Sequence, residues 1–359
     1  MKRATESSVG MELSPGVRRT LIRFVVAPSW VLMSALVLLL LAGLEVSGWV
    51  QYVPFALSLV FLGLPHGAVD HLVPGRLSAG GVSAGSITAV TLLYLVLAGI
   101  YLTFWYFAPV AAFVFFIALT WFHWGQGDLY SNIAFLRIRP STRTSKALTV
   151  LVRGGLPMLV PLLAFPEVYS DVAETIVGLF SVPGELAWLS DPAIRSIAGV
   201  IFSVSILATF AWGYAISRQY SASAWGLDVA ETVLLLTFFA LAPPVFAVGI
   251  YFCLWHAPRH IARLMLVNHS SLVTLEKGMF RPALKDFVCD AFPLTAAALL
   301  LLAGLYLFVP ANVEGNAELL ALYLVLISVL TLPHVAIVGL MDRWQGLWRA
   351  GVEGSKISR

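Results

Sequence analysis

Four short stretches place histidines and carboxylates toward the ends of long apolar segments. They read GLPHGAVDHL at 63–72, FHWGQGD at 122–128, WHAPRH at 255–260 and LPHVAIVGLMDR at 332–343. An ionisable side chain at membrane depth is costly and usually faces the interior of a helix bundle, so each histidine marks a candidate functional site. A lone histidine near a helix end is more often a hydrogen-bonded packing residue, but five histidines at one depth, as described below, are hard to explain in that way. Neutral imidazoles without cysteine suit iron, copper or zinc, and the pattern therefore predicts a metal site.

The composition indicates that an integral membrane protein carries these stretches. Apolar residues make up 59% of the chain and charged residues only 11%, against roughly 25% charged residues in an ordinary soluble domain. The 359 residues suffice for about ten spans of roughly 20 residues each. Cys253 and Cys289 neither demand a disulfide nor match a zinc pattern. The fold class predicted is an all-α, polytopic membrane helical bundle, and a net charge of +3 gives no reason to expect a nucleic-acid partner.

Apolar runs divide the chain into ten predicted transmembrane helices. They cover 24–44, 52–73, 86–107, 109–129, 147–165, 194–216, 225–241, 243–266, 287–309 and 319–340. The fifth is the least regular, because its glycines and prolines can break a helix. Segment 167–191 is predicted to be a loop with a short amphipathic helix. The first apolar run has span length and no convincing cleavage site after it, so we interpret it as a retained helix.

Basic residues provide an independent check on this topology, because lysine and arginine concentrate in cytoplasmic loops. With the N-terminus inside, the inward segments collect 20 of the 22 basic residues, and the outward loops hold Arg195 and mostly acids. An odd number of spans would destroy this bias. We therefore expect both termini to be cytoplasmic, in a multi-pass protein of the cell membrane. The predicted division is a cytoplasmic segment 1–23, one transmembrane domain 24–342 and a cytoplasmic tail 343–359.

This topology places five histidines from four helices in one layer. Counted at about 1.5 Å per residue from the outer end of each helix, they lie roughly 19–25 Å deep in a hydrocarbon core about 30 Å thick. The five are His66, His123, His256, His260 and His334. His71 and His269 fall closer to the cytoplasmic loops, or in them. The shared depth favours one site over groups strung across the membrane.

Local spacing adds two weaker clues. His256 and His260 are four residues apart and can share a helical face, although Pro258 between them can kink the helix. A carboxylate follows the histidine layer in three of the helices, as Asp70, Asp128 and Asp342. These carboxylates either accept hydrogen bonds from ligand N–H groups or cap helix ends at the interface, and the sequence favours neither reading.

The motifs PHGAVDH, FHWGQGD, WHAPRH and PHVAIVGLMDR, in this order, resemble those of the Brp/Blh family of membrane β-carotene 15,15′-dioxygenases. The resemblance extends from His66 to Arg343. It implies that dioxygen cleaves the central double bond of β-carotene and that retinal is produced for a rhodopsin, with which a functional association would follow. Such chemistry needs a redox metal, because a polyene offers no acyl carbon or ionised group.

The resemblance also implies which residues would bind this metal. The family is regarded as using non-haem iron, Fe(2+), and the positions that match its histidine motifs are the catalytic and metal-ligand candidates His66, His123, His256 and His260. His71 and His334 remain candidates for a fifth ligand, an acid–base contact or packing. Together with the three carboxylates they form the group expected around the ligands: Asp70, His71, Asp128, His334 and Asp342.

The implied substrate suits a membrane setting. An apolar polyene partitions into lipid and can enter sideways between helices, and aromatic side chains beside the histidines can pack it. Aromatic residues in membrane helices are more often packing or interface residues. The candidates are Trp121, Phe122, Trp124, Tyr251, Phe252 and Trp255. No feature of the sequence sets an oligomeric state.

Several other functions compete with this one. A membrane di-iron hydroxylase needs more histidines in clustered boxes than the seven present here. A haem protein needs two axial histidines on facing helices. A transporter with a histidine and aspartate relay would show broken helices and related halves. A member of the resembled family can also cleave a different carotenoid, or be a non-cleaving accessory protein of retinal supply.

Overall fold

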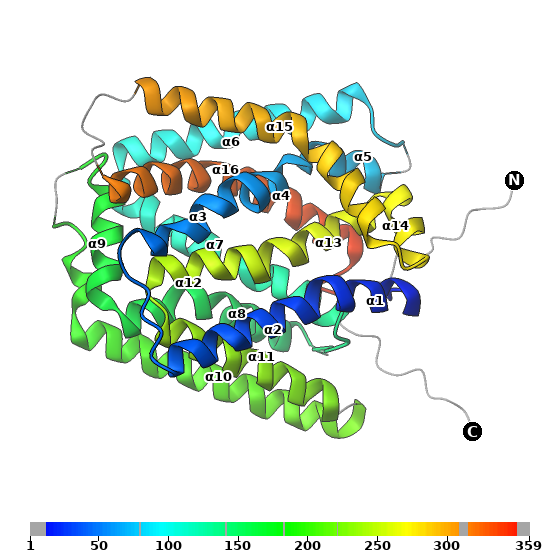
Figure 1. The fold of residues 1–359 in the computed structure, drawn as a ribbon, viewed down its shortest axis with the longest axis horizontal. Coiled ribbons are helices and arrows are strands. Elements are labelled where there is room, and N and C mark those ends of the chain that lie inside the picture. The colour runs from blue at the N-terminus through cyan, green and yellow to red at the C-terminus, as the bar shows by residue number, and fades with distance from the viewer. Residues whose placement is uncertain are drawn as a thin grey trace, which may run out of the picture.

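The computed structural model describes residues 12–78, 80–140, 142–181, 184–220, 222–308 and 315–349. Within these ranges the regular elements are helices, with no strand, which confirms the all-α prediction. The α-helices are α1 (Pro15–Leu21), α2 (Ala27–Leu41), α3 (Val53–Ser58), α4 (Leu64–Ala68), α5 (Val73–Leu77), α6 (Ala84–Phe107), α7 (Pro109–Ala134), α8 (Arg143–Ala164), α9 (Pro166–Val177), α10 (Pro192–Tyr220), α11 (Ala222–Leu241), α12 (Pro244–Tyr251), α13 (Ala257–Val267), α14 (His269–Glu276), α15 (Phe280–Phe308) and α16 (Asn316–Gln345). The long helices lie roughly side by side in one bundle (Figure 1).

Shorter helical pieces of other types join some of these helices. Three are π-helical: η1 (Ile22–Val26), η3 (Leu59–Gly63) and η6 (Phe252–His256). Three are 3₁₀-helical: η2 (Gly48–Tyr52), η4 (Asp70–Leu72) and η5 (Ala187–Ser190). The predicted second span is thus assembled from short pieces between Gly48 and Leu77.

Nine helical stretches within the described residues are long and apolar enough to cross a membrane. They correspond to nine of the ten predicted spans; the remaining one, 243–266, is present as an unbroken helix made of α12, η6 and α13. Arg259, Arg263 and two histidines make this helix more polar than the others. Val309, the last residue of the predicted ninth span, lies outside the described residues.

The glycines and prolines of the predicted fifth span do not break α8. The glycines instead permit close contact between α7 and α8. A Cβ atom on Gly154 would lie 1.9 Å from the Trp121 carbonyl oxygen, and one on Gly125 would lie 2.1 Å from that of Val150. Both distances are far below van der Waals contact. The span that was least regular in sequence is therefore tightly packed against the helix that carries His123.

The first and last described segments meet at the same end of the bundle, on the right in Figure 1. Arg18 Nε donates to the Phe135 carbonyl at 2.7 Å, and Lys146 Nζ donates to the Leu347 carbonyl at 2.8 Å. This agrees with an even number of spans, whereas the cytoplasmic orientation stays a prediction. Residues 1–11 and 350–359 of the predicted terminal segments lie outside the described residues, and a helix begins within segment 1–23 at Pro15.

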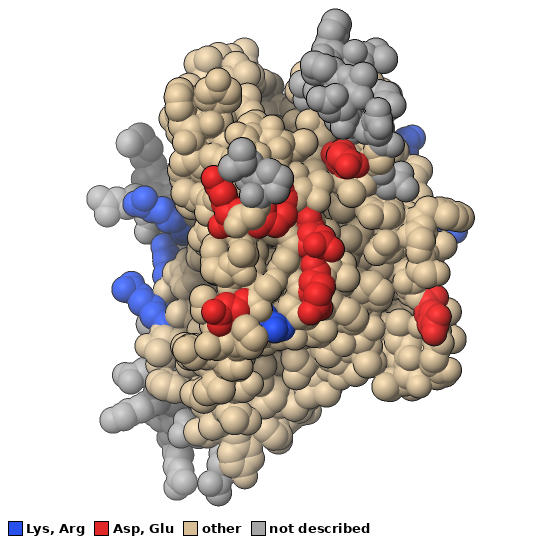
Figure 2. Space-filling view, turned by 90° about the vertical axis from the view of Figure 1, so that its left-hand side faces the viewer, with Lys and Arg blue, Asp and Glu red and all other residues tan. Residues whose placement is uncertain are grey.

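The opposite end of the bundle carries acidic side chains (Figure 2). Exposed or half-buried acids at this end include Glu167 and Glu174 of α9 and Asp191 before α10. α9 begins one residue before the segment that was predicted to be a loop with a short amphipathic helix, and η5 follows it within that segment. The two ends therefore differ in charge as the topology requires.

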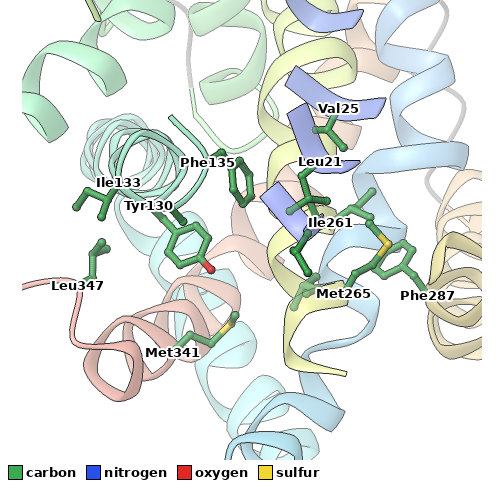
Figure 3. Packing of buried hydrophobic residues seen from close by; sticks show 14 of the residues in the cluster. Leu21, Val25, Tyr130, Ile133, Phe135, Ile261, Met265, Phe287, Met341 and Leu347 are labelled. Atoms are coloured by element: carbon green, nitrogen blue, oxygen red, sulfur yellow. The ribbon is translucent and has the colours of Figure 1, made fainter. Parts of the chain in front are cut away.

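A buried apolar cluster holds the polar helix α13 in place. Figure 3 shows Ile261 and Met265 of α13 packed among Leu21 of α1 and Phe287 of α15. Leu21 and Met341 are fully buried in the same cluster. Protein interiors are close-packed, so this packing limits how far α13 can move. The histidines of this helix are thus presented by a rigid element.

Candidate metal centre

Two π-helical turns position three of the histidines. His66 lies three residues after η3, and His256 is the last residue of η6, four residues before His260. A π-turn contains one more residue than an α-turn, so it changes the direction in which the following side chains point. Such turns are frequent at functional sites. Here the two π-helical turns, η3 and η6, pack against each other next to the histidines.

Pro258 does not separate His256 from His260. It occupies the first turn of α13, where a proline is tolerated. Pro258 cannot donate to the Leu254 carbonyl, four residues earlier, and this oxygen lies within hydrogen-bond distance of the Ser29 hydroxyl of α2, which also lies 2.7 Å from the Val25 carbonyl. The rings of His256 and His260 are 6.2 Å apart and within 13° of parallel. The HxxxH spacing therefore delivers both imidazoles to one side.

The five histidines of the predicted layer gather in one cluster. Their ring centroids lie between 4.8 Å, for His123 and His334, and 6.2 Å, for His256 and His260, in the contacting pairs. All five are buried, with 9% or less of each residue exposed. The potential ligand atoms of His66, His123 and His256 all lie within 4.8 Å of one another. The cluster comprises His66 of α4, His123 of α7, His256 of η6, His260 of α13 and His334 of α16.

Most ring nitrogens of the cluster lack hydrogen-bond partners among the described residues. This holds for both nitrogens of His123 and His260 and for Nε2 of His256 and His334. His66 Nδ1 faces the Gly63 carbonyl at 2.5 Å and donates to it, which leaves Nε2 free. A buried polar group without a partner costs about 1–3 kcal/mol. Several such nitrogens facing one another fit a metal ion that would accept their lone pairs.

The three predicted carboxylates have different surroundings. Asp70 Oδ2 lies 2.6 Å from His334 Nδ1 and accepts the Tyr94 hydroxyl at 2.5 Å. Asp128 accepts Trp255 Nε1 at 3.1 Å, whereas Asp342 accepts Arg263 Nη2 at 2.7 Å. Among the hydrogen bonds of the described residues, Asp70 is the only one of the three carboxylates that pairs with a histidine of the cluster.

The remaining predicted neighbour, His71, bonds elsewhere. Its Nδ1 lies 2.8 Å from the Ala68 carbonyl, and it is half-buried beside the cluster. Among the described ring contacts, none joins His71 to the five clustered histidines. The structure thus places it one turn beyond the cluster.

The candidate aromatic residues divide into two groups. Trp124 and Phe252 lie against the cluster, with ring centroids 5.6 Å and 5.7 Å from that of His256. Tyr251 packs on Trp124 at 5.1 Å. The other group turns away. Trp255 bonds Asp128, Trp121 donates to the Leu151 carbonyl, and Phe122 is 40% exposed on the surface of the bundle.

A buried network of charges beside the cluster was not predicted. Glu231 Oε2 lies 3.0 Å from Arg153 Nη2, and its Oε1 lies 3.1 Å from Arg259 Nη2. Arg153 also pairs with Asp228 at 2.7 Å. The signal was present in the sequence, because Arg153 and Glu231 are charged residues within apolar spans. That the two residues pair, from α8 and α11, is shown by the structure.

Comparisons with known proteins agree on one family. A family model described as Beta-carotene 15,15'-dioxygenase matches residues 57–342. "Probable beta-carotene 15,15'-dioxygenase Blh" of Halobacterium salinarum is 46% identical over 340 residues, covering 93% of this chain and 97% of that protein. "Probable beta-carotene 15,15'-dioxygenase Brp" of Halobacterium salinarum is 29% identical over 325 residues, covering 86% and 88%.

A third relative is more distant. "Beta-carotene 15,15'-dioxygenase" of an uncultured marine bacterium, 66A03, is 22% identical over 294 residues, covering 80% of this chain and 93% of that protein. No solved structure matches the chain.

Proposed function

Because the chain belongs to the β-carotene 15,15′-dioxygenase family, we propose that it cleaves the central double bond of β-carotene with dioxygen to produce retinal. One dioxygen molecule per substrate supplies one oxygen atom to each of the two aldehydes formed. The observation that carries the proposal is the buried cluster of histidines, most of whose ring nitrogens lack hydrogen-bond partners among the described residues. The retinal would serve a rhodopsin, and the enzyme would be a multi-pass protein of the cell membrane with residues 24–342 as its membrane domain.

The catalytic metal would be Fe(2+), held by His66, His123, His256 and His260. A redox metal bound there supplies the oxygen activation that a hydrocarbon substrate needs. The chain's own contribution is to fix the ligands. The Gly63 carbonyl sets the tautomer of His66, and Ser29 supports the turn that carries His256.

Trp124 and Phe252 would pack the polyene beside the metal. Both are buried and both contact the His256 ring. Flat apolar side chains fit a conjugated chain and exclude water from the reacting bond. The substrate would reach this site from the bilayer, in which it is already dissolved. A proton relay across the membrane fits the geometry less well, because the contacting rings lie within 6.2 Å of one another.

Co-expression in β-carotene-producing cells tests this function. Carotene loss and retinal gain are measured by chromatography, for the unaltered protein and for His66→Ala and His256→Ala. We expect retinal only with the intact histidines. His269→Ala removes an exposed histidine outside the cluster and is the matched control. Membrane-inserted protein that leaves β-carotene intact under aerobic, iron-replete conditions would overturn the proposal and favour another carotenoid or an accessory role.

A further inference from the structure

The ring of His334 lies as close to three of the four proposed ligands as those ligands lie to one another, next to the group of His66, His123 and His256 whose potential ligand atoms lie within 4.8 Å of one another. Its ring centroid lies 4.8 Å from that of His123, 4.9 Å from that of His66 and 5.1 Å from that of His260. The distances between proposed ligands are no shorter, with 5.0 Å for His123 and His256. His334 is 5% exposed, and its Nε2 has no hydrogen-bond partner among the described residues. Packing alone does not explain a buried nitrogen without a partner at the centre of such a cluster.

The other nitrogen of His334 is engaged in the way that metal-bound histidines usually are. A metal-ligating imidazole commonly donates its second N–H to a carboxylate or carbonyl, which fixes the tautomer and the ring orientation. His334 Nδ1 lies 2.6 Å from Asp70 Oδ2, which leaves Nε2 as the nitrogen available to a metal. Asp70 in turn accepts the Tyr94 hydroxyl of α6 on the same oxygen. Three helical segments thus converge to orient one ring.

The charge of Asp70 provides an independent argument. This carboxylate is 1% exposed, and its Oδ1 has no partner among the described residues. The only basic group within ion-pair distance in the described part of the chain is His334 itself. Burying an unpaired carboxylate is strongly unfavourable. A divalent cation bound through His334 would supply the positive charge that Asp70 otherwise lacks.

We propose that His334 is a fifth imidazole ligand of the metal and that Asp70 and Tyr94 are positioning residues that orient it. This inference rests on the metal centre of the proposed function. The sequence segment 63–72 would then serve the site twice, through the ligand His66 and through the carboxylate that orients His334.

Metal binding by purified full-length protein in detergent tests the inference without reference to turnover. The protein is loaded with Fe(II), and X-ray absorption gives the number of bound imidazoles. Titration with Co(II) gives the affinity and, from the intensity of the visible bands, the coordination number. We expect His334→Ala to lose one imidazole and to weaken metal binding by about 10-fold or more, with stronger Co(II) bands. If added imidazole restores the Co(II) affinity of His334→Gly, the substitution has removed a metal ligand and has not unfolded the protein.

Conservative changes test the positioning residues. Asp70→Asn keeps the size of the side chain, and we expect metal affinity to fall about 10–100-fold with the imidazole count unchanged. Tyr94→Phe should show a smaller fall. Tyr101→Phe is its control, because Tyr101 lies on the same helix and is buried, but its hydroxyl donates to the Ala112 carbonyl, away from the cluster.

The outcomes separate this inference from the proposed function. Folded His334→Ala that retains the imidazole count and Co(II) spectrum of the unaltered protein would overturn the fifth ligand while the proposed cleavage stands. Unaltered protein that binds metal with five imidazoles but yields no retinal would support the ligand and overturn the cleavage. Unaltered protein that binds neither Fe(II) nor Co(II) would overturn both.

Discussion

Two regions on either side of the histidine cluster bury carboxylates in opposite ways. In the region of Asp70, the partners are a histidine and a tyrosine, and neither carries a permanent charge. In the region of Glu231, the partners are Arg153 and Arg259, which are always cationic. The arginine region is therefore neutralised whether or not metal is bound, whereas the Asp70 region depends on a charge from outside the chain. We infer that the arginine region around Glu231 holds helices together and that the region of Asp70 responds to the metal.

The largest expected loss of stability comes from breaking the ion pairs of the arginine region, which consists of Glu231, Arg153 and Arg259. Glu231→Gln removes the charge that both guanidinium groups share, and breaking a buried ion pair costs about 3–5 kcal/mol. Thermal unfolding in detergent, followed by size-exclusion chromatography, should show this loss both with and without metal. Trp30→Phe is the control, because it removes the indole N–H that donates to Glu231, together with part of the ring, but leaves the charge of Glu231 in place. A destabilisation that vanishes on metal removal would contradict the division into two regions.

Removal of the metal should cause the next largest loss of stability. A ligand that binds only the folded state stabilises it by about 2.7 kcal/mol at a concentration about 100 times its Kd. A chelator should therefore lower the unfolding temperature of the unaltered protein, and added Fe(II) should restore it. The same treatment of the His123→Ala protein should have little effect. Equal sensitivity of both proteins to the chelator would mean that the stabilising metal is bound elsewhere.

The effect of Asp70→Asn on the free energy of unfolding should change sign when metal binds. Without metal, the substitution removes an uncompensated buried carboxylate, and we expect stability to be equal or up to about 1–3 kcal/mol higher. With metal, the unaltered protein should be the more stable, because its carboxylate is then paired. Unfolding temperatures of both proteins, each with and without Fe(II), measure this. Destabilisation by Asp70→Asn in the absence of metal would show that Asp70 is neutralised by the chain itself.

The sequence predicted that five histidines share one level because helix rise and the outer helix ends determine it, and the structure brings the five rings together. It did not predict which carboxylate serves which histidine. Asp70 and His334 are 264 residues apart, and their contact depends on how α16 packs against the second span. Apolar periodicity also carries no sign of the π-turns before His66 and at His256, because one additional residue in a turn leaves the composition of a span unchanged.

The pairing of charged residues was equally beyond the sequence. Arg153 was evident as an arginine within an apolar span, yet its partners lie on α11, 75 and 78 residues away. Asp128 and Asp342 resembled Asp70 in position relative to the histidine layer. Packing gives them arginine and tryptophan partners instead of a histidine. Helix order in space, which local patterns do not encode, made this distinction.

The smallest expected effect on stability and on Co(II) affinity concerns the helix segment that belongs to both regions. The segment formed by η6 and α13 carries His256 and His260 of the cluster and Arg259 of the arginine region, and its Leu254 carbonyl lies within hydrogen-bond distance of the Ser29 hydroxyl. Ser29→Ala removes this hydroxyl, and a lost hydrogen bond of this kind costs about 0.5–1.5 kcal/mol. Because one segment serves both regions, stability with chelator and Co(II) affinity should both fall slightly. Ser328→Ala, which removes a buried hydroxyl on α16 that accepts from Trp105, is the control. A change in stability without any change in Co(II) affinity would mean that the turn supports only the arginine region and that the two regions are not mechanically joined.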